Sequence, residues 1–185
     1  RRQFLLEQAR MFVWGMQPTI ANLMDEQFTR RAGEIAYLTR LARLRHANRA
    51  WLQDGAFVIP PASDAPELSF AGSRISIYAA RRGGPTEVPL RAPAVLTGAW
   101  RAASGAVGIA LASIDDAPHR LTLALDPVRH ATSRGATLWR VDASGKKRVG
   151  ALGPGARQLT VDVGALEGVL LVIEPLAAKS PPPPR

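Results

Sequence analysis

The residue types that perform most enzyme chemistry are few in this sequence, and they do not combine into a catalytic set. The histidines have neither metal-ligand spacing nor a paired carboxylate: His46, His119 and His130. There is no cysteine, which excludes a thiol nucleophile and a Cys-based zinc site. The sequence therefore predicts no catalytic residue, no metal site and no cofactor in this chain.

Two further motifs are better explained as turns and loops. Asp115-Asp116 stands at a predicted hairpin, where acidic residues are ordinary turn formers. Gly150 to Gly155 is rich in glycine, but it lies between predicted strands with no helix after it, so it is not a phosphate-binding loop. No Gly-x-Ser-x-Gly motif is present, and no two carboxylates can be assigned as the acid and base of a hydrolase.

The most informative stretch is a short apolar run that stops at a glycine and turns at Pro18. Such a run before a long helix is typical of a buried parallel strand, so Met11 to Gly15 is predicted as a strand and residues 14–22 as the loop at its carboxyl end. In a β/α barrel that end carries the active site, which would place Trp14 and Gln17 at its rim. Alternatively, the run is the apolar end of the first helix, because periodicity cannot type so short a segment.

Helical patterns flank this stretch on both sides. Residues 1–10 are predicted as the end of a helix, with apolar positions on one side. Residues 25–53 are predicted as a second helix about 40 Å long, with Asp25 and Glu26 in its first turn and Gly55 as its stop. Two prolines and small polar residues then indicate a linker over residues 57–66.

Beyond the linker the apolar period changes from 3.6 to 2, which indicates strands. Leu121, Leu123 and Leu125 alternate with polar or small residues and give the clearest case. Eight short strands with turns between them are typical of an antiparallel sandwich. The predicted strands are 67–71, 74–80, 94–101, 106–113, 119–126, 136–142, 157–163 and 168–174.

Composition and charge limit the class of partner. The 185 residues carry 24 Lys+Arg and 15 Asp+Glu, a net charge of +9. Residues 1–54 contribute 9 and 5 of these (+4) and residues 55–185 contribute 15 and 10 (+5), so the charge is spread and a nucleic-acid partner is not expected. No run of 18 apolar residues occurs, so no membrane partner is expected. Residues 178–185 are proline-rich and predict an extended tail.

The run from Ala9 to Asn22, followed by Ile35 to Arg45, resembles the last strand and helix of a glycoside-hydrolase-like TIM barrel from a poorly characterised bacterial family. Residues 95–101, 105–116 and 169–174 resemble the β-sandwich that follows the barrel in many glycosidases. Ser113 departs from that pattern, because such sandwiches often have Asn there. The resemblance implies that the catalytic carboxylates lie on barrel strands that precede this sequence.

These observations predict an α+β chain: the last β/α unit of a truncated barrel over residues 1–56, a linker, a sandwich over residues 67–177 and a tail. The resemblance implies the C-terminal fragment of a glycoside hydrolase, inactive alone, with the upstream barrel and a carbohydrate substrate as partners. Trp14 and Gln17 would then contact sugar, because an indole face suits a sugar ring and an amide both donates to and accepts from hydroxyls. The alternatives are a carbohydrate-binding or structural module that uses Trp100 or Trp139, and a basic nucleic-acid-binding protein. The compartment is not determined.

Overall fold

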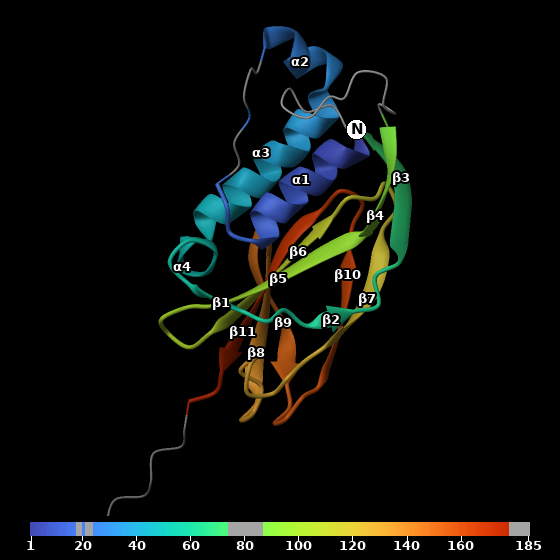
Figure 1. The fold of residues 1–185 in the computed structure, drawn as a ribbon. Coiled ribbons are helices and arrows are strands. Elements are labelled where there is room, and N and C mark those ends of the chain that lie inside the picture. Colours follow the sequence, from blue (N-terminus) through green and yellow to red (C-terminus); the bar gives the residue numbers. More distant parts are fainter. Residues whose placement is uncertain (18–19, 21–23, 74–86, 178–185) are drawn as a thin grey trace, which may run out of the picture.

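The computed structural model describes residues 1–17, 20, 24–73 and 87–177. It is an α+β structure, as predicted, in which a layer of helices covers one face of a large sheet (Figure 1). The described helices are α1 (Arg2–Val13), α2 (Asp25–Arg30), α3 (Ala32–Ala47) and α4 (Arg49–Leu52).

Antiparallel strands make up the rest of the described chain. A six-stranded sheet has the order β1-β5-β6-β11-β8-β9, a three-stranded sheet the order β10-β7-β2, and β3 and β4 form a separate pair. The strands are β1 (Ala56–Val58), β2 (Ala62–Ser63), β3 (Glu67–Ser73), β4 (Glu87–Pro93), β5 (Val95–Arg101), β6 (Val107–Ser113), β7 (His119–Ala124), β8 (Ala136–Asp142), β9 (Gly145–Leu152), β10 (Gln158–Val163) and β11 (Gly168–Pro175).

The six-stranded and three-stranded sheets enclose one apolar core. Every second side chain of each strand points into this core, because successive side chains of a strand point to opposite faces of the sheet. Ile109 and Leu171 from the large sheet and Leu121, Leu123 and Val161 from the small sheet belong to the same buried cluster. This packing explains why the alternating leucines of β7 were the clearest strand signal in the sequence.

The opposite face of the six-stranded sheet packs against the helices and forms a second core. Phe12 of α1, Tyr37 and Leu41 of α3, and Leu170 of β11 are fully buried within it. Glycines let the helices approach the sheet closely: a Cβ on Gly108 would lie 2.8 Å from Cδ1 of Trp51. The helical segment is therefore an integral layer of the fold.

The structure corrects the prediction of a strand over Met11–Gly15. Met11 to Val13 form the last turn of α1, and the chain leaves the helix through Gly15. The amide of Met16 donates to the carbonyl of Met11 (2.8 Å) and that of Gly15 to the carbonyl of Phe12 (3.0 Å). This bonding pattern, with a left-handed glycine at φ 65°, is a Schellman helix end. The alternative, an apolar helix end, was the right interpretation of this run.

Two other segments differ from their predictions. The helical pattern of residues 25–53 is confirmed, but Arg31 and Asn48 interrupt it and divide it into α2, α3 and α4. Residues 57–66, predicted as a linker, instead contribute to both sheets. Phe57 pairs with Trp100 of β5, and β2 pairs with β7.

The strand predictions are confirmed to within two residues at each end for β3, β5, β6, β7, β8, β10 and β11. The sequence reading missed β9, because its run of basic residues hides the period-2 pattern; it also missed the short β1 and β2, and β4. The predicted strand over residues 74–80 and the proline-rich tail at 178–185 lie outside the described residues, as does Pro18.

Candidate functional site

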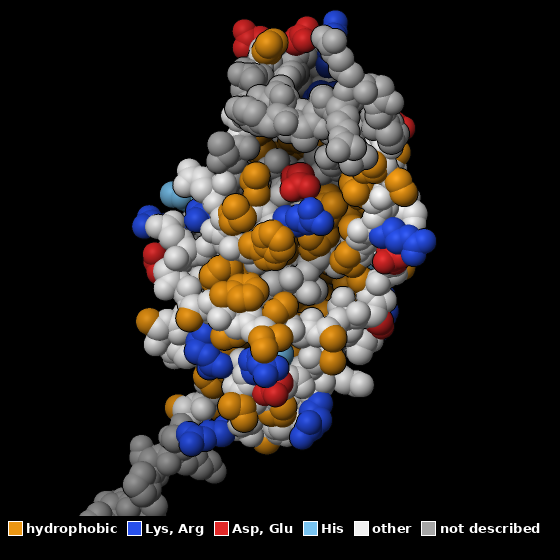
Figure 2. Space-filling view, viewed as in Figure 1, with side chains coloured by type: hydrophobic (Ala, Val, Ile, Leu, Met, Phe, Trp, Pro, Cys, Tyr) orange, Lys and Arg blue, Asp and Glu red, His pale blue; other side chains and the backbone are white. Residues whose placement is uncertain are grey.

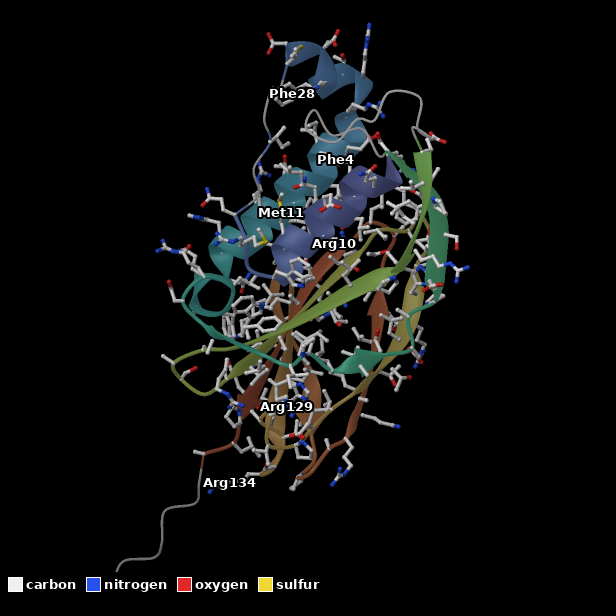
Figure 3. The ribbon with its side chains drawn as sticks, viewed as in Figure 1. Phe4, Arg10, Met11, Phe28, Arg129 and Arg134 are labelled. Carbon is white, nitrogen blue, oxygen red and sulfur yellow. The ribbon has the colours of Figure 1, made fainter. Side chains whose placement is uncertain are left out.

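Helix α1 presents two different faces. Its inner face is buried against the sheet and includes Leu5, Ala9 and Phe12. Its outer face carries residues at spacings of three and four, which share one side of a helix: Phe4, Glu7, Met11 and Trp14, with Arg10 beside them. Figure 3 shows Phe4, Arg10 and Met11 along α1, and Figure 2 shows apolar side chains around acidic and basic ones on this face. We call this set the α1 outer face.

A cavity of about 500 Å³ lies at the amino-terminal end of the α1 outer face. Three helices or their flanking residues surround it. Carboxylates, guanidinium groups and amides line it beside apolar side chains: Arg1, Gln3, Phe4, Glu7, Ile20, Gln27, Arg31, Glu34 and Ile35. A volume of this size suits a small ligand, and the lining offers both hydrogen-bond donors and acceptors.

Ion pairs hold the charged groups of this cavity in place. Glu7 contacts Arg10 (3.2 Å) within α1, and Glu34 of α3 contacts Arg31 (3.4 Å), the residue that precedes α3. Arg1 makes a bidentate pair with Asp116 at 2.7 and 2.8 Å, and this hydrogen bonding lowers the pKa of Asp116. The side chains of the Glu7–Arg10 and Arg1–Asp116 pairs are exposed, so each of these two pairs contributes little to stability and can open to a ligand.

Trp14 stands at the other end of the α1 outer face, about 15 Å from Phe4 at 1.5 Å per residue. The side chain of Trp14 is 53% exposed. The backbone around it is fixed from two sides: Trp100 Nε1 donates to the carbonyl of Val13 (3.0 Å), and Arg45 Nε donates to the carbonyl of Gly15 (3.1 Å). The indole therefore extends from a rigid base into solvent.

Gln17 and Met16 follow directly and are also exposed. The two residues that the sequence reading selected, Trp14 and Gln17, thus lie on the surface near one another in the chain. They lie at a helix end, whereas the prediction placed them at the rim of a barrel strand. The contact of these two side chains with a sugar stays a prediction.

The other tryptophans nominated from the sequence, Trp100 and Trp139, are engaged within the fold. Both lie half-buried on the helix-facing side of the six-stranded sheet. Phe57 packs edge-on against Trp100 at a centroid distance of 5.0 Å. Trp139 Nε1 donates to Glu174 (2.6 Å), and Lys146 Nζ stands 4.5 Å from the centre of its ring. Each indole thus uses its N–H group and one side of its ring for contacts within the protein.

His130 and His119 have structural partners, and His46 is exposed on α3. The amide of Asp126 donates to Nδ1 of His130 (2.8 Å), so Nε2 carries the proton and donates to the carbonyl of Ile59 (3.1 Å). Burial lowers the pKa of His130. His119 Nε2 contacts Asp115 (3.0 Å), which also accepts from Arg2.

The most closely associated carboxylates elsewhere are already paired. Arg140 of β8 donates to Asp142 (2.9 Å) and Glu167 (2.6 Å) and so forms an ion pair with each of them. Within the described ranges no group of three or more His, Asp or Glu side chains could hold a metal ion. Glu7 and Glu34 are the carboxylates that line the cavity described above.

Sequence reasoning missed Phe4, Glu7 and Glu34 as site residues. A signal existed for the first two, because Phe4, Glu7, Met11 and Trp14 recur at helical spacing once α1 is extended to Val13. The prediction of a strand from Met11 broke that series. Glu34 comes from another helix, and only packing brings it to the cavity.

Comparison with known proteins gives limited information. No protein-family model matches the sequence, and no curated protein matches it. Several solved structures of glycoside hydrolases share a partial likeness. One is a GH27 β-L-arabinopyranosidase from Geobacillus stearothermophilus, with 15% identity over 47% of this chain and 18% of that chain and a TM-score of 0.37.

Two others cover more of the chain. A GH51 arabinofuranosidase from Xanthomonas axonopodis pv. citri has 17% identity over 72% of this chain and 26% of its own, with a TM-score of 0.40. An α-amylase from Anoxybacillus has 10% identity over 96% of this chain and 33% of its own, with a TM-score of 0.41. The chain therefore spans about a fifth to a third of these proteins. Likeness at these scores does not establish a shared fold or a shared activity.

Proposed function

We propose that this chain is the C-terminal, carbohydrate-contacting part of a glycoside hydrolase, and that the α1 outer face contacts the glycan. The observation that carries the proposal is the continuous outer face of α1, from the 500 Å³ cavity to the exposed Trp14. The resemblance of residues 9–22 and 35–45 to the end of a glycosidase barrel supports the enzyme class. The predicted strand at Met11–Gly15 is not part of this proposal.

The chemistry of the α1 outer face suits a sugar. Sugar rings have an apolar face that packs on an aromatic ring, and exposed Trp14 and half-buried Phe4 can supply one at each end. Sugar hydroxyls both donate and accept hydrogen bonds. The carboxylates of Glu7 and Glu34 accept, and the amides of Gln3 and Gln27 do both.

Catalysis would come from residues of the enzyme outside these 185. Hydrolysis of a glycosidic bond requires two carboxylates across the scissile bond, one of them able to donate a proton. Glu7 and Glu34 each form an ion pair with an arginine, and the resemblance implies that the catalytic carboxylates lie on other barrel strands. We therefore expect the 185-residue chain to bind sugar without turning it over.

Affinity electrophoresis of the purified chain through gels that contain soluble polysaccharides tests the proposal. The expected result is retardation by at least one polysaccharide, weakened about tenfold by Trp14→Ala, which corresponds to about 1.4 kcal/mol. Val128→Ala is the matched control, because Val128 is 79% exposed and lies away from α1 in a turn after β7. Equal mobility of the wild type and both variants in every gel would reject sugar binding by α1.

A second measurement separates catalysis from binding. The purified chain is assayed on aryl glycosides and on any polysaccharide that retards it. Turnover that survives repurification and disappears in Glu7→Gln or Glu34→Gln would show that the chain carries its own catalytic carboxylates and would overturn the non-catalytic assignment. In the intact enzyme, Gln17→Ala should lower kcat/KM by a factor that corresponds to about 1–3 kcal/mol of transition-state stabilisation, the scale of an amide that pairs with a substrate hydroxyl.

A further inference from the structure

The two sheets that share a core differ in width, and one strand is left uncovered. β10 is the edge strand of the three-stranded sheet and lies over β8, because Arg140 Nη1 of β8 donates to the carbonyl of Asp162 of β10 (2.8 Å). β9 continues the six-stranded sheet one strand further. Most residues of β9 are exposed, on both of its faces. The small sheet therefore ends where a fourth strand would cover β9.

A groove of about 350 Å³ occupies the place of that missing strand. Its lining comes from β8, β9, β10 and β11. Apolar side chains form most of it, with Arg140, Thr160 and Asp162 among them: Leu138, Val149, Leu152, Leu159, Val161 and Leu171. Val149 is 48% exposed. Gly150 also lines the groove, and a Cβ there would meet nothing within 4 Å.

The backbone of β10 offers hydrogen bonds toward this groove. The amide of Leu125 donates to the carbonyl of Arg157 (2.7 Å), so Arg157 and Leu125 form a hydrogen-bonded pair of the β10–β7 ladder. Such pairs alternate along an antiparallel ladder. Gln158, Thr160 and Asp162 therefore direct their backbone N–H and C=O groups away from β7, toward the free edge, where Arg140 bonds Asp162.

β10 has few of the features that protect exposed edges from pairing, although the side chain of Arg140 meets its edge at Asp162. Among the described edge strands of the two stacked sheets, β1 has three residues and β2 has two. β9 carries Lys146, Lys147 and Arg148, and the β8–β9 ladder has an irregularity between Leu138 and Trp139. β10 has six residues, alternates exposed and buried positions, and contains neither proline nor lysine.

We propose that the groove between β9 and β10 binds an extended peptide by strand addition to β10. The side chains of the bound peptide that point into the groove are apolar where they meet Leu159 and Val161. Lys147 of β9 is the register partner of Arg140, so its side chain lies on the groove side of β9, near Asp162. A carboxylate of the bound peptide that points into the groove would face Lys147. This peptide site is independent of the proposed carbohydrate contact.

The probe is a fluorescein-labelled heptapeptide, Thr-Glu-Thr-Val-Thr-Val-Thr, whose binding is followed by fluorescence anisotropy. Antiparallel addition places its glutamate at the Lys147 end and its valines in the groove. Its threonine N–H groups then face the outward groups of β10. We expect saturable binding to the wild-type chain. A control peptide, N-methylated at the second and third threonines, lacks the donors and should bind about tenfold more weakly or not at all.

Two glycine substitutions locate the site. Gly150→Trp fills the groove with an indole. Gly153→Trp is the matched control, because a Cβ at either position meets nothing within 4 Å and Gly153 follows the end of β9. We expect Gly150→Trp to abolish binding and Gly153→Trp to retain it, with unchanged circular dichroism in both. Absence of binding to the wild type, equal binding of the methylated peptide, or an equal effect of the two substitutions would each overturn the proposal.

Discussion

The indole Nε1 of Trp100 donates to the carbonyl of Val13 at 3.0 Å and thereby connects β5 of the six-stranded sheet to the end of α1. The same ring lies beneath Gly15, where an added Cβ would come within 2.8 Å of it. This contact connects residues 87 positions apart. It also sets the base from which Trp14 extends, so helix packing and the candidate site depend on one another.

Replacement of Trp100 by phenylalanine tests that connection. Trp100→Phe keeps an aromatic ring but leaves the carbonyl of Val13 without this donor, so we expect a loss of about 1–3 kcal/mol in the free energy of unfolding. Trp139→Phe is the control, because Glu174 would keep its contact with Lys146 (2.9 Å) and the loss should be smaller. Urea denaturation measures the free energy of unfolding of both variants. Equal losses would show that the Trp100 hydrogen bond stabilises the fold no more than the Trp139 hydrogen bond does.

Glycine-to-alanine substitutions should have opposite signs at two positions. At Gly15, φ is 65° and a Cβ would lie 2.5 Å from the carbonyl oxygen of Leu52, so Gly15→Ala is expected to destabilise by more than about 1 kcal/mol. At Gly33 in α3, a Cβ meets nothing within 4 Å, so Gly33→Ala should stabilise by about 0.5–1 kcal/mol. Thermal unfolding gives both signs, and a stable Gly15→Ala variant would contradict the helix end described here.

The helices and the sheet should unfold together. Phe12 is fully buried in the core that both share, so Phe12→Ala is expected to cost about 3–5 kcal/mol. Because one core joins the layers, circular dichroism of the helices and tryptophan fluorescence should report one coincident urea transition. Two separated transitions, with only the first shifted in the variant, would mean that the helical layer folds independently.

His130 should make stability depend on pH. Its folded pKa is lowered, mainly by burial, so the unfolded chain binds more protons once the pH falls below about 6.5. The stability contributed by neutral His130 is fully present above that value and is lost as the pH falls toward the folded pKa. Urea midpoints measured between about pH 8 and pH 5 should therefore decrease. His130→Gln should flatten this decrease; an unchanged slope would assign it to other groups.

Part of this structure follows from local sequence. Alternation of Leu121, Leu123 and Leu125 defined β7, because a half-buried strand shows period 2 whatever its partner. The spacing of apolar residues over 25–53 defined the helical region, although not its breaks at Arg31 and Asn48. These signals depend on which face of an element is buried, and the sequence records that directly.

Other features were decided by tertiary contacts. Gly15 could end a strand or a helix, and its left-handed conformation beneath Trp100 selects the helix end. The segment over residues 57–66 pairs with both sheets because β5 and β7 offer free edges to it.

The sequence alone determined that the chain is α+β, that it has no cysteine chemistry and that its basic charge is spread over both halves. Only the tertiary structure brought Glu34 to the cavity beside Glu7 and left β9 without a covering strand. Such relationships join residues far apart in the chain, and local periodicity does not record which surfaces meet.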